Sequence, residues 1–472
     1  GLLLIFAVAR RSFDGPVDGV VYGALIGAGF AFTENIQNLA KLLGGIEFPS
    51  ANYDLWHSLA EKAVSGPSFE DALISKTEDG IGVDPVLGRS NAPSLLPRQK
   101  PNMPWHFVQR VDDTDTFRAN RQAREDIDQG ATGLSLVFEG APNAFGHGLP
   151  STPETLDAVL ADVPINRTHL RIDAHPLSRA MADWFVAYLV KRRVDPSKLS
   201  LSFGIDPAAV FAGTGRLSMS IEALQASMPQ SLAHFFAIGV PGVLLEADGR
   251  VYHNAGATEA QELGAMLASA AAHLRLFEDA RQALVYAAPH IGFAVSVDQD
   301  QFLSIAKIRA LRMLWSRMLE VSSIPFSPVA IHAETSWRML TAADPETNIL
   351  RSTIACFSAA VGGADSISVL PHTIPHGLPA GFARRIARNT QLLIAAESHL
   401  DIVADPASGS GSIEALTRAL CENAWNEFRA IEREGGILRS LAAGALQQRI
   451  VAAREQRAGQ FRDGQRQIVG TT

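Results

Sequence analysis

Two short segments of this sequence carry side chains whose types and spacing could support chemistry. Asp173 and His175 lie at the end of a strand-like run and could form an acid–base pair; the alternative is a capping aspartate beside a surface histidine. Tyr252 and His253 follow another strand-like run, where the alternative to a functional role is a connecting loop. These two pairs are the candidate sites, and neither is specific to one reaction.

Other polar clusters are weaker indications of a site. Arg384, Arg385 and Arg388 fall within one and a half turns of a predicted helix, where they could bind phosphate or carboxylate groups or form a solvated or interface face. His372 and His376 are four positions apart, but a proline between them predicts a loop and not a metal-binding helix. The sequence has no Walker loop, no Gly-x-Gly-x-x-Gly after a strand, no His-Glu-x-x-His and no Gly-x-Ser-x-Gly. Motifs of this kind therefore define no reaction.

The elements that must position these side chains alternate between strands and helices. Eight strand-like runs recur, each beginning 28 to 49 residues after the previous one. They are residues 105–110, 133–138, 168–173, 199–205, 242–247, 291–297, 329–335 and 365–371. Helical segments between parallel strands predict an α/β fold of the (β/α)8 TIM barrel type, with a doubly wound open sheet as the alternative. Both candidate pairs would then lie at the carboxyl ends of strands, the catalytic face of such barrels.

Composition divides the chain into segments. Residues 53–80 read as helix, and five prolines between residues 84 and 104 predict an extended arm. After residue 377 the pattern is helical throughout. The predicted order is an apolar N-terminal segment, a helix with a proline-rich arm, the barrel and a helical linker, at residues 1–45, 46–104, 105–376 and 377–472.

The overall composition limits the classes of function. Of the 472 residues, 47% are hydrophobic, and a net charge of −8 offers no basic face to a nucleic-acid backbone. The two cysteines, Cys356 and Cys421, cannot form a disulfide framework or a four-thiolate metal site. We therefore expect a globular cytoplasmic protein that binds no metal and no nucleic acid.

The first 45 residues differ from the rest. Their apolar runs, residues 2–9 and 20–32, fall short of the ~20 residues that span a bilayer. Residues 13–35 resemble a segment of the PrsW-type intramembrane metalloproteases, with Phe30 and Glu34 in that family's Phe-x-x-x-Glu motif. The family's Glu-Glu and His-x-x-x-Asp motifs have no counterpart nearby, and one carboxylate cannot hold a catalytic metal. We expect a fused or misjoined fragment; the alternative is an amphipathic helix docked on the main domain.

Several separate motifs resemble the methylmalonyl-CoA mutase family, in that family's order, from about residue 50 to residue 472. They are Arg384-Arg-Ile-Ala-Arg-Asn-Thr-Gln391 and residues 305–310, 335–337, 340–351, 362–363, 403–409 and 434–436. The resemblance implies a (β/α)8 barrel whose axis is lined by small residues and holds acyl-CoA, followed by a helical linker and a cobalamin-binding domain. It also implies adenosylcobalamin, whose cobalt–carbon bond breaks to start a radical rearrangement of the carbon skeleton, in propionate metabolism.

The positions of the family's catalytic residues differ in this chain. Arg110 stands where a catalytic chain has a tyrosine that shields the radical. Alignment on residues 255–257 places Val251 at the histidine that polarises the thioester carbonyl, whereas alignment on Tyr252 and His253 requires a two-residue deletion. The family's cobalamin motif, Asp-x-His-x-x-Gly, is not recognisable in the sequence.

These departures resemble the small, non-catalytic subunit of the heterodimeric mutase, and we expect the sequence to end before a cobalamin-binding domain. The resemblance implies a catalytic large subunit as partner, which binds adenosylcobalamin, while acyl-CoA binding by this chain stays possible. Tyr252 and His253 would then be vestigial site residues, with no cofactor-binding residue in the chain. The alternative is a divergent catalytic mutase that uses Tyr252 and His253 and takes cobalamin from a separate chain.

Overall fold

The structure, a computed structural model, describes residues 52–64, 68–101 and 103–471, in two compact units made of residues 1–72 and 73–472. In the first unit, α3 (Tyr53–Ala63) begins after Asn52, whose side chain accepts a hydrogen bond from the Leu55 N–H at 2.8 Å. The helix α4 (Phe69–Leu73) follows. The PrsW-like residues of the sequence analysis lie outside the described residues.

The prediction that residues 53–80 are helical holds for α3 and α4 but is wrong after Leu73. After α4, the chain forms a two-stranded antiparallel hairpin of β1 (Ser75–Lys76) and β2 (Gly82–Val83). Gly80, at φ +73°, provides the left-handed conformation of the connecting turn, and Thr77 Oγ1 accepts from the Ile81 N–H at 3.1 Å. A hairpin, and not a continuation of the helix, therefore occupies residues 75–83.

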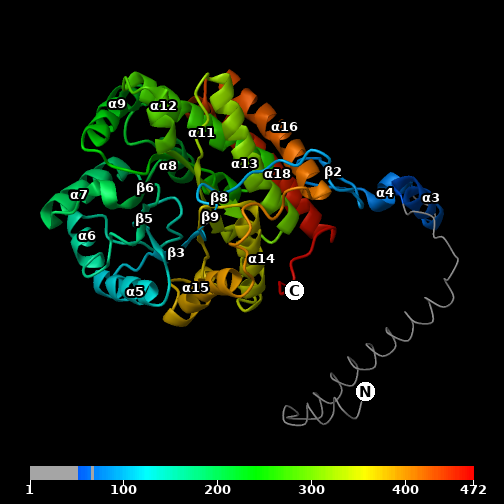
Figure 1. Cartoon of the computed structure of the whole chain (residues 1–472), viewed down its shortest axis with the longest axis horizontal. Helices are drawn as coiled ribbons and strands as arrows, with labels where there is room; N and C mark the ends of the chain where they lie inside the picture. Colours follow the sequence, from blue (N-terminus) through cyan, green and yellow to red (C-terminus); the bar gives the residue numbers. More distant parts are fainter. Residues whose placement is uncertain (1–51, 65–67, 102, 472) are drawn as a thin grey trace, which may run out of the picture. The chain divides into compact units, whose positions relative to one another are not determined.

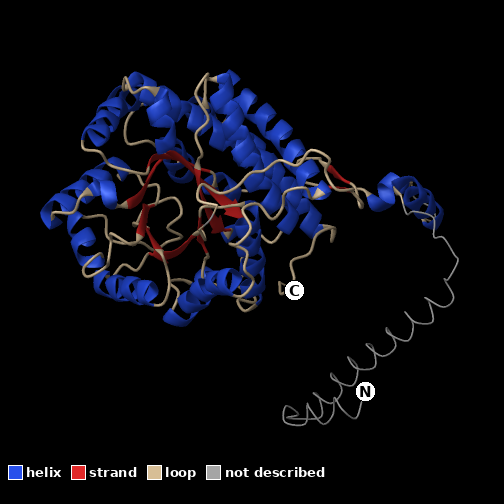
Figure 2. Cartoon of the chain, in the orientation of Figure 1, coloured by secondary structure: helices blue, strands red, loops and turns tan. Residues whose placement is uncertain are grey.

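Eight parallel strands close into a barrel, as the sequence predicted. They are β3 (His106–Val111), β4 (Gly133–Leu136), β5 (His169–Ile172), β6 (Ser200–Ile205), β7 (Val243–Asp248), β8 (Ile291–Val297), β9 (Ala330–Thr335) and β10 (Ser366–Ser368). Each strand pairs with the next along the chain, and β10 pairs with β3 to complete the ring. Figure 2 shows this closed ring of strands inside a ring of helices.

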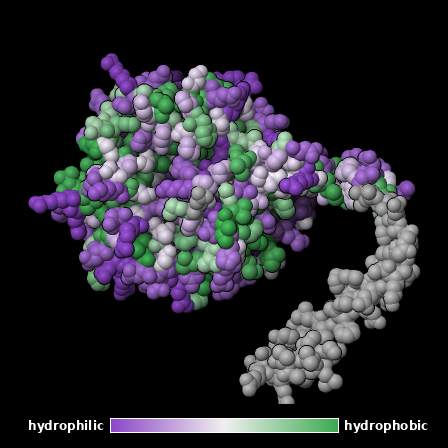
Figure 3. All heavy atoms as spheres, in the orientation of Figure 1, coloured by the Kyte–Doolittle hydropathy of each residue, from purple (hydrophilic) through white to green (hydrophobic). Residues whose placement is uncertain are grey.

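Helices connect successive strands and cover the outside of the barrel (Figure 1). They are α5 (Thr116–Asp128), α6 (Pro153–Val159), α7 (Ser178–Arg192), α8 (Pro207–Thr214), α9 (Ile221–Ala237), α10 (Arg250–Ala255), α11 (Glu259–Asp279), α12 (Leu284–Ala287), α13 (Gln301–Val321) and α14 (Thr347–Gly362). Outward-facing strand residues such as Leu134, Phe203 and Phe293 are at most 3% exposed beneath these helices. On the face shown in Figure 3, polar and apolar side chains are interspersed.

The last helices pack on the barrel within the same compact unit. They are α15 (Gly381–Ala396), α16 (Gly411–Arg433), α17 (Ile437–Ala443) and α18 (Ala445–Arg462). Ile431, Leu441 and Ile450 from this region form an apolar cluster with Val251 and Tyr252. Among the helices of the described ranges, none is long and apolar enough to cross a bilayer.

The proline-rich arm before β3 forms no helix or strand but packs against the barrel and the linker. The Gln99 N–H donates to Asp365 Oδ1 at 2.6 Å, and the Leu96 N–H donates to Asp405 Oδ2 at 2.8 Å. Arg98 is only 2% exposed. Side chains of the barrel and linker thus accept hydrogen bonds from backbone N–H groups of the arm, which form no β-ladder.

Candidate functional site

Two kinds of side chain line the barrel axis and alternate from strand to strand. Strands β4, β6, β8 and β10 contribute the small residues Ser135, Ser202, Ala294, Ser296, Ser366 and Ser368. Strands β3, β5, β7 and β9 contribute the large charged residues Arg110, Arg171, Glu246, Asp248 and Glu334, in register with small neighbours. TIM barrels are usually filled by layers of bulky apolar residues from alternate strands. Here the corresponding layers are charged.

The charged side chains join in one buried chain of ion pairs, called here the lumen network. Its members are all at most 2% exposed: Arg110, Arg171, Asp173, Glu246, Asp248, Arg250 and Glu334. Arg250 lies 3.2 Å from Asp173, 2.7 Å from Asp248 and 3.2 Å from Glu334. Arg171 pairs with Glu246 and, at 3.1 Å, with Asp173. Arg110, on β3, lies 3.8 Å from Glu334, so the network joins inward side chains of β3, β5, β7 and β9.

Burial and neighbouring charges set the protonation of the network. Burial alone would raise the pKa of the Asp173 carboxyl, but Arg250 and Arg171 outweigh it and hold that pKa well below its usual range. Burial raises the pKa of Glu334 and of Glu246, and the nearby arginines offset this only in part. Asp173 is thus firmly ionised, and its position between two guanidinium groups leaves it no role as a general base.

Aromatic residues cover the catalytic end of the axis. Phe145, in the loop after β4, and Trp337, after β9, stack with ring centroids 4.3 Å apart and planes inclined by 10°. The guanidinium carbon of Arg110 lies 5.0 Å from the centroid of the Phe145 ring. Phe145 has φ +52°, a conformation that is rare for a bulky residue. The stack joins the loop after β4 to the turn after β9, beside Arg110 of the lumen network.

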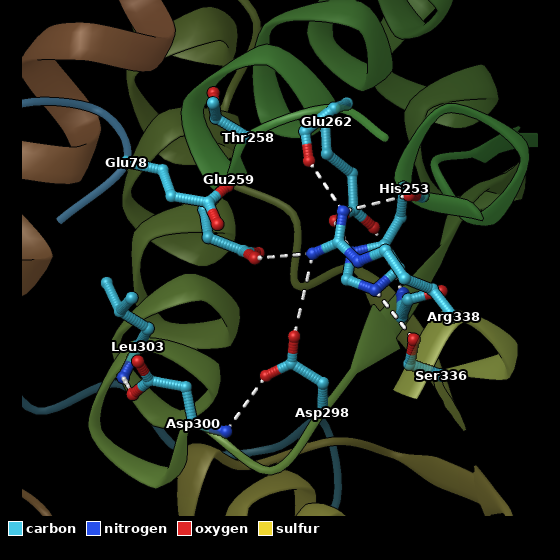
Figure 4. Close-up of polar contacts among 12 residues, drawn as sticks. Glu78, His253, Thr258, Glu259, Glu262, Asp298, Asp300, Leu303, Ser336 and Arg338 are labelled. Atoms are coloured by element: carbon cyan, nitrogen blue, oxygen red, sulfur yellow. Dashed lines mark hydrogen bonds and ion pairs between the residues drawn. The ribbon is translucent and has the colours of Figure 1, made fainter. Parts of the chain in front are cut away.

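The structure places Tyr252 and His253 on α10, after the fifth strand of the barrel, with both side chains buried. His253 Nδ1 is 3.2 Å from Glu262 Oε2, and Nε2 is 2.8 Å from Ser336 Oγ (Figure 4). Tyr252 packs in the apolar cluster with α17 and α18, and its hydroxyl has no hydrogen-bond partner among the described residues. His253 is thus held by α11 and the turn after β9, whereas Tyr252 is held by α17 and α18.

Five charged residues around His253 were not predicted from the sequence. Figure 4 shows the carboxylates of Glu259 and Asp298 directed at Arg338, each 3.6 Å from its Nη2. Lys307 Nζ pairs with Glu259 and, at 2.8 Å, with Glu262. His253, Glu259 and Glu262 are close enough together to hold a metal ion, but the ammonium group of Lys307 already supplies the positive charge there. The sequence signal that could have revealed this cluster is Lys307, a lysine on the buried face of a predicted helix.

The other sequence candidates do not form a joint site. Asp173 belongs to the lumen network, whereas His175 contacts the carbonyl oxygen of Glu139 through Nε2 at 2.7 Å. The expected solvated or interface role of the arginines on α15 is wrong for two of them. Arg384 pairs with Asp112 at 2.7 Å and Arg388 pairs with Asp126 at 2.6 Å, and all four side chains are buried. Their function is to attach α15 to the barrel.

Comparison with protein families gives two matches. The model described as methylmalonyl-CoA mutase matches residues 96–472. The model described as PrsW family intramembrane metalloprotease matches residues 1–49. Both agree with the resemblances noted in the sequence.

Curated relatives agree with the first match. The chain is 36% identical over 448 residues to the methylmalonyl-CoA mutase small subunit of Streptomyces virginiae, covering 90% of this chain and 71% of that protein. It is 40% identical over 399 residues to the probable small subunit of Mycobacterium tuberculosis, covering 80% of this chain and 63% of that protein. The methylmalonyl-CoA mutase large subunit of Streptomyces virginiae is 26% identical over 473 residues, covering 91% of this chain and 63% of that protein. The chain thus spans about two thirds of the length of these relatives.

Proposed function

This chain belongs to the methylmalonyl-CoA mutase family, and from that premise we propose that it acts as the small, non-catalytic subunit of a heterodimeric mutase. Its partner is a large subunit that binds adenosylcobalamin and interconverts methylmalonyl-CoA and succinyl-CoA. The small-subunit relatives, at 36% and 40% identity, support this choice over the large subunit at 26%. A cytoplasmic location is part of the proposal, because Cys356 and Cys421 are both free thiols.

The lumen network is the observation that carries the proposal. An acyl-CoA chain threaded along the axis would have to displace seven charged side chains, each at most 2% exposed. Separating one partner of a buried ion pair costs about 3–5 kcal/mol, and several pairs would have to separate at once. An uncharged pantetheine arm returns no comparable electrostatic energy. The barrel is therefore closed to a substrate that needs its full length.

The groups at the catalytic positions also cannot assist the reaction. The Arg110 guanidinium is engaged by Asp112 at 2.6 Å and by the carbonyl oxygen of Asn143. Val251 is 9% exposed in an apolar cluster and has no hydrogen-bond donor for a thioester carbonyl. Loss of one such donor typically lowers turnover by about 100–1000-fold.

The residues at the mouth do not fit adenosylcobalamin. A corrin ring needs a broad free surface and an axial imidazole, whereas the Phe145 and Trp337 rings stack on each other across the mouth. His175 and His253 each contact protein groups through both ring nitrogens. We therefore assign the cofactor to the partner chain.

The test is methylmalonyl-CoA turnover by the purified chain, by the large subunit and by the two together, each with adenosylcobalamin. We expect no turnover by this chain alone and a stable complex of the two chains on gel filtration. Turnover by this chain alone that is abolished in His253→Ala would establish the divergent catalytic mutase instead. Failure to form a complex with the large subunit encoded in the same genome would contradict the subunit role.

A further inference from the structure

A cavity opens beside the barrel axis, at the carboxyl ends of β4, β5 and β6. It has a volume of about 710 Å³ and is bordered by the loops after these strands and by α7, α8 and α9. Among the described residues that line it, none belongs to the lumen network. The ion pairs that fill the axis therefore leave this cavity, called here the side pocket, open to a ligand. It lies at the end of the barrel where TIM barrels bind their ligands.

The wall of the side pocket is mostly apolar. Its apolar side chains include Ile205, Val210, Leu217, Met219, Leu224 and Met228. Leu177 also lines the pocket and is 44% exposed, and Met219 is 38% exposed, so the apolar wall continues to the protein surface. Cavities of this volume with a mostly apolar wall are typical of small-molecule sites. The wall is thus suited to a ligand with a hydrocarbon chain.

One guanidinium group in the wall carries an uncompensated charge. Arg179, on α7, donates to the hydroxyl groups of Ser227 and Ser231 on α9 at 2.7–3.0 Å. These acceptors are neutral, and among the described residues no carboxylate lies within ion-pair distance of Arg179. With a longer bond to the carbonyl oxygen of Ser227, they occupy at most four of the five N–H groups of a guanidinium. One N–H group and the positive charge thus stay available to a ligand.

The other titratable groups of the wall do not neutralise Arg179. Glu139 and Asp183 are exposed, so water and salt screen their charges. Asp206 is buried and accepts hydrogen bonds from two backbone N–H groups at 2.9 and 3.0 Å, and burial raises its pKa to about 7. Burial lowers the pKa of His175, so its imidazole is neutral at pH 7. Arg179 is therefore the partly buried charge that a ligand in the side pocket meets.

We propose that the side pocket binds an amphiphilic monocarboxylic acid, with the carboxylate at Arg179 and the hydrocarbon chain along the apolar wall. The carboxylate accepts a charge-assisted hydrogen bond from the free N–H group of Arg179. The chain removes apolar surface from water, which is the main favourable contribution for such a ligand. The proposal does not depend on the subunit role.

Isothermal titration calorimetry of the full chain with decanoate at pH 7.5 tests the side pocket. We expect saturable binding by the wild type and at least tenfold weaker binding by Arg179→Met. Arg124→Met, which removes an arginine 51% exposed on α5, is the matched control and should bind like the wild type. Absence of saturable binding by the wild type, or equal binding by Arg179→Met, overturns the proposal.

Compounds that share only one part of decanoate separate the two contributions. Decan-1-ol has the chain without the charge, and acetate has the carboxylate without the chain, so each should bind at least tenfold more weakly than decanoate. Binding of decan-1-ol as tight as that of decanoate would refute carboxylate recognition, and equally tight binding of acetate would refute the role of the apolar wall.

A readout in the wild-type chain locates the ligand. His175 lines the side pocket, so decanoate should shift its imidazole NMR signals and leave those of His399, exposed in the linker, unchanged. Unchanged His175 signals at saturating decanoate would overturn the proposal. Ala180→Trp enlarges a side chain of the wall and should abolish binding, and undiminished binding by this variant would place the ligand outside the side pocket.

Discussion

Charged residues in the family motifs stabilise the fold, although their positions in the sequence suggest a chemical role. Lys307 and Arg309, from the motif at residues 305–310, are completely buried and pair with carboxylates. Arg351, from the motif at residues 340–351, donates to the Asn348 side chain at 2.8 Å. A buried charge that loses its partner is costly, so Lys307 and Arg309 require carboxylates that lie 45 and 105 positions away in the sequence.

Arg250 should be the residue whose loss harms the lumen network most, because it contacts three carboxylates. Arg250→Met leaves Asp173, Asp248 and Glu334 without this cation, and we expect the free energy of unfolding to fall by about 3–5 kcal/mol. Urea unfolding followed by circular dichroism measures the change. The control Arg118→Met removes an arginine that is 50% exposed and should leave the midpoint nearly unchanged. A midpoint of Arg250→Met close to the wild type would show that the network contributes little.

The buried His273 should make the stability of the fold depend on pH. Burial lowers its pKa to about 4, while the unfolded chain takes up a proton near pH 6.5. Stability from the neutral imidazole is therefore complete above about pH 6.5 and is lost as the pH falls toward 4, because the unfolded state then binds more protons. In His273→Gln, the decrease in urea midpoint between pH 7.5 and 5 should be smaller than in the wild type.

The control for that experiment is His234→Gln, which changes an exposed imidazole on α9 and should keep the wild-type pH dependence. An undiminished decrease in His273→Gln would exclude His273 as its source.

At the scale of elements, a buried arginine joins three segments that are distant in sequence. Arg309, on α13, pairs with Asp405 before α16 and, at 2.9 Å, with Glu414 within α16. Its Nη2 also donates to the carbonyl oxygen of Ser94 in the proline-rich arm at 2.9 Å. Both the arm and the linker are thus attached to the barrel at one point.

Loss of this junction should loosen the linker before it unfolds the barrel. In Arg309→Met, Asp405 and Glu414 remain buried without their cation, and we expect the loop at residues 399–410 to be cleaved at least tenfold faster by a low concentration of protease. Mass spectrometry of the fragments locates the cut. Arg317→Met, on the same helix but 57% exposed, is the control. Equal cleavage rates in the two variants would contradict this junction.

At the scale of the whole molecule, barrel and linker helices form one compact unit of residues 73–472. The family match begins at residue 96, and residues 1–49 match a different family. Segments that match two different families need not share one folding unit.

We therefore predict that deletion of residues 1–45 leaves the barrel intact. The Tm should change by no more than about 2 °C, because about 1 kcal/mol already shifts the Tm by a few degrees. Differential scanning calorimetry of the full and shortened chains measures this. A decrease of 5 °C or more would show that these residues stabilise the barrel.

The sequence by itself determined the barrel. Eight apolar runs, such as the seven residues 291–297, alternate with segments of helical spacing. A strand of this kind must bury both of its faces, and a barrel of parallel strands covered by helices does this for all eight. The same local information failed over residues 74–80, where the hairpin of β1 and β2 replaces the expected helix. The sequence also revealed that Arg110 and Val251 depart from the catalytic pattern, because the motifs that contain these positions are short and continuous.

Only the tertiary structure decided what the charged residues do. Arg171 and Glu246 are 75 positions apart, and Arg250 and Glu334 are 84 apart, so no local spacing reveals that they share the barrel axis. The interpretation of Arg384 and Arg388 failed for the same reason, since their partners Asp112 and Asp126 lie more than 250 positions away. Closure of the barrel brings inward side chains of distant strands within hydrogen-bond reach, and the electrostatics of the axis exist only once that ring is closed.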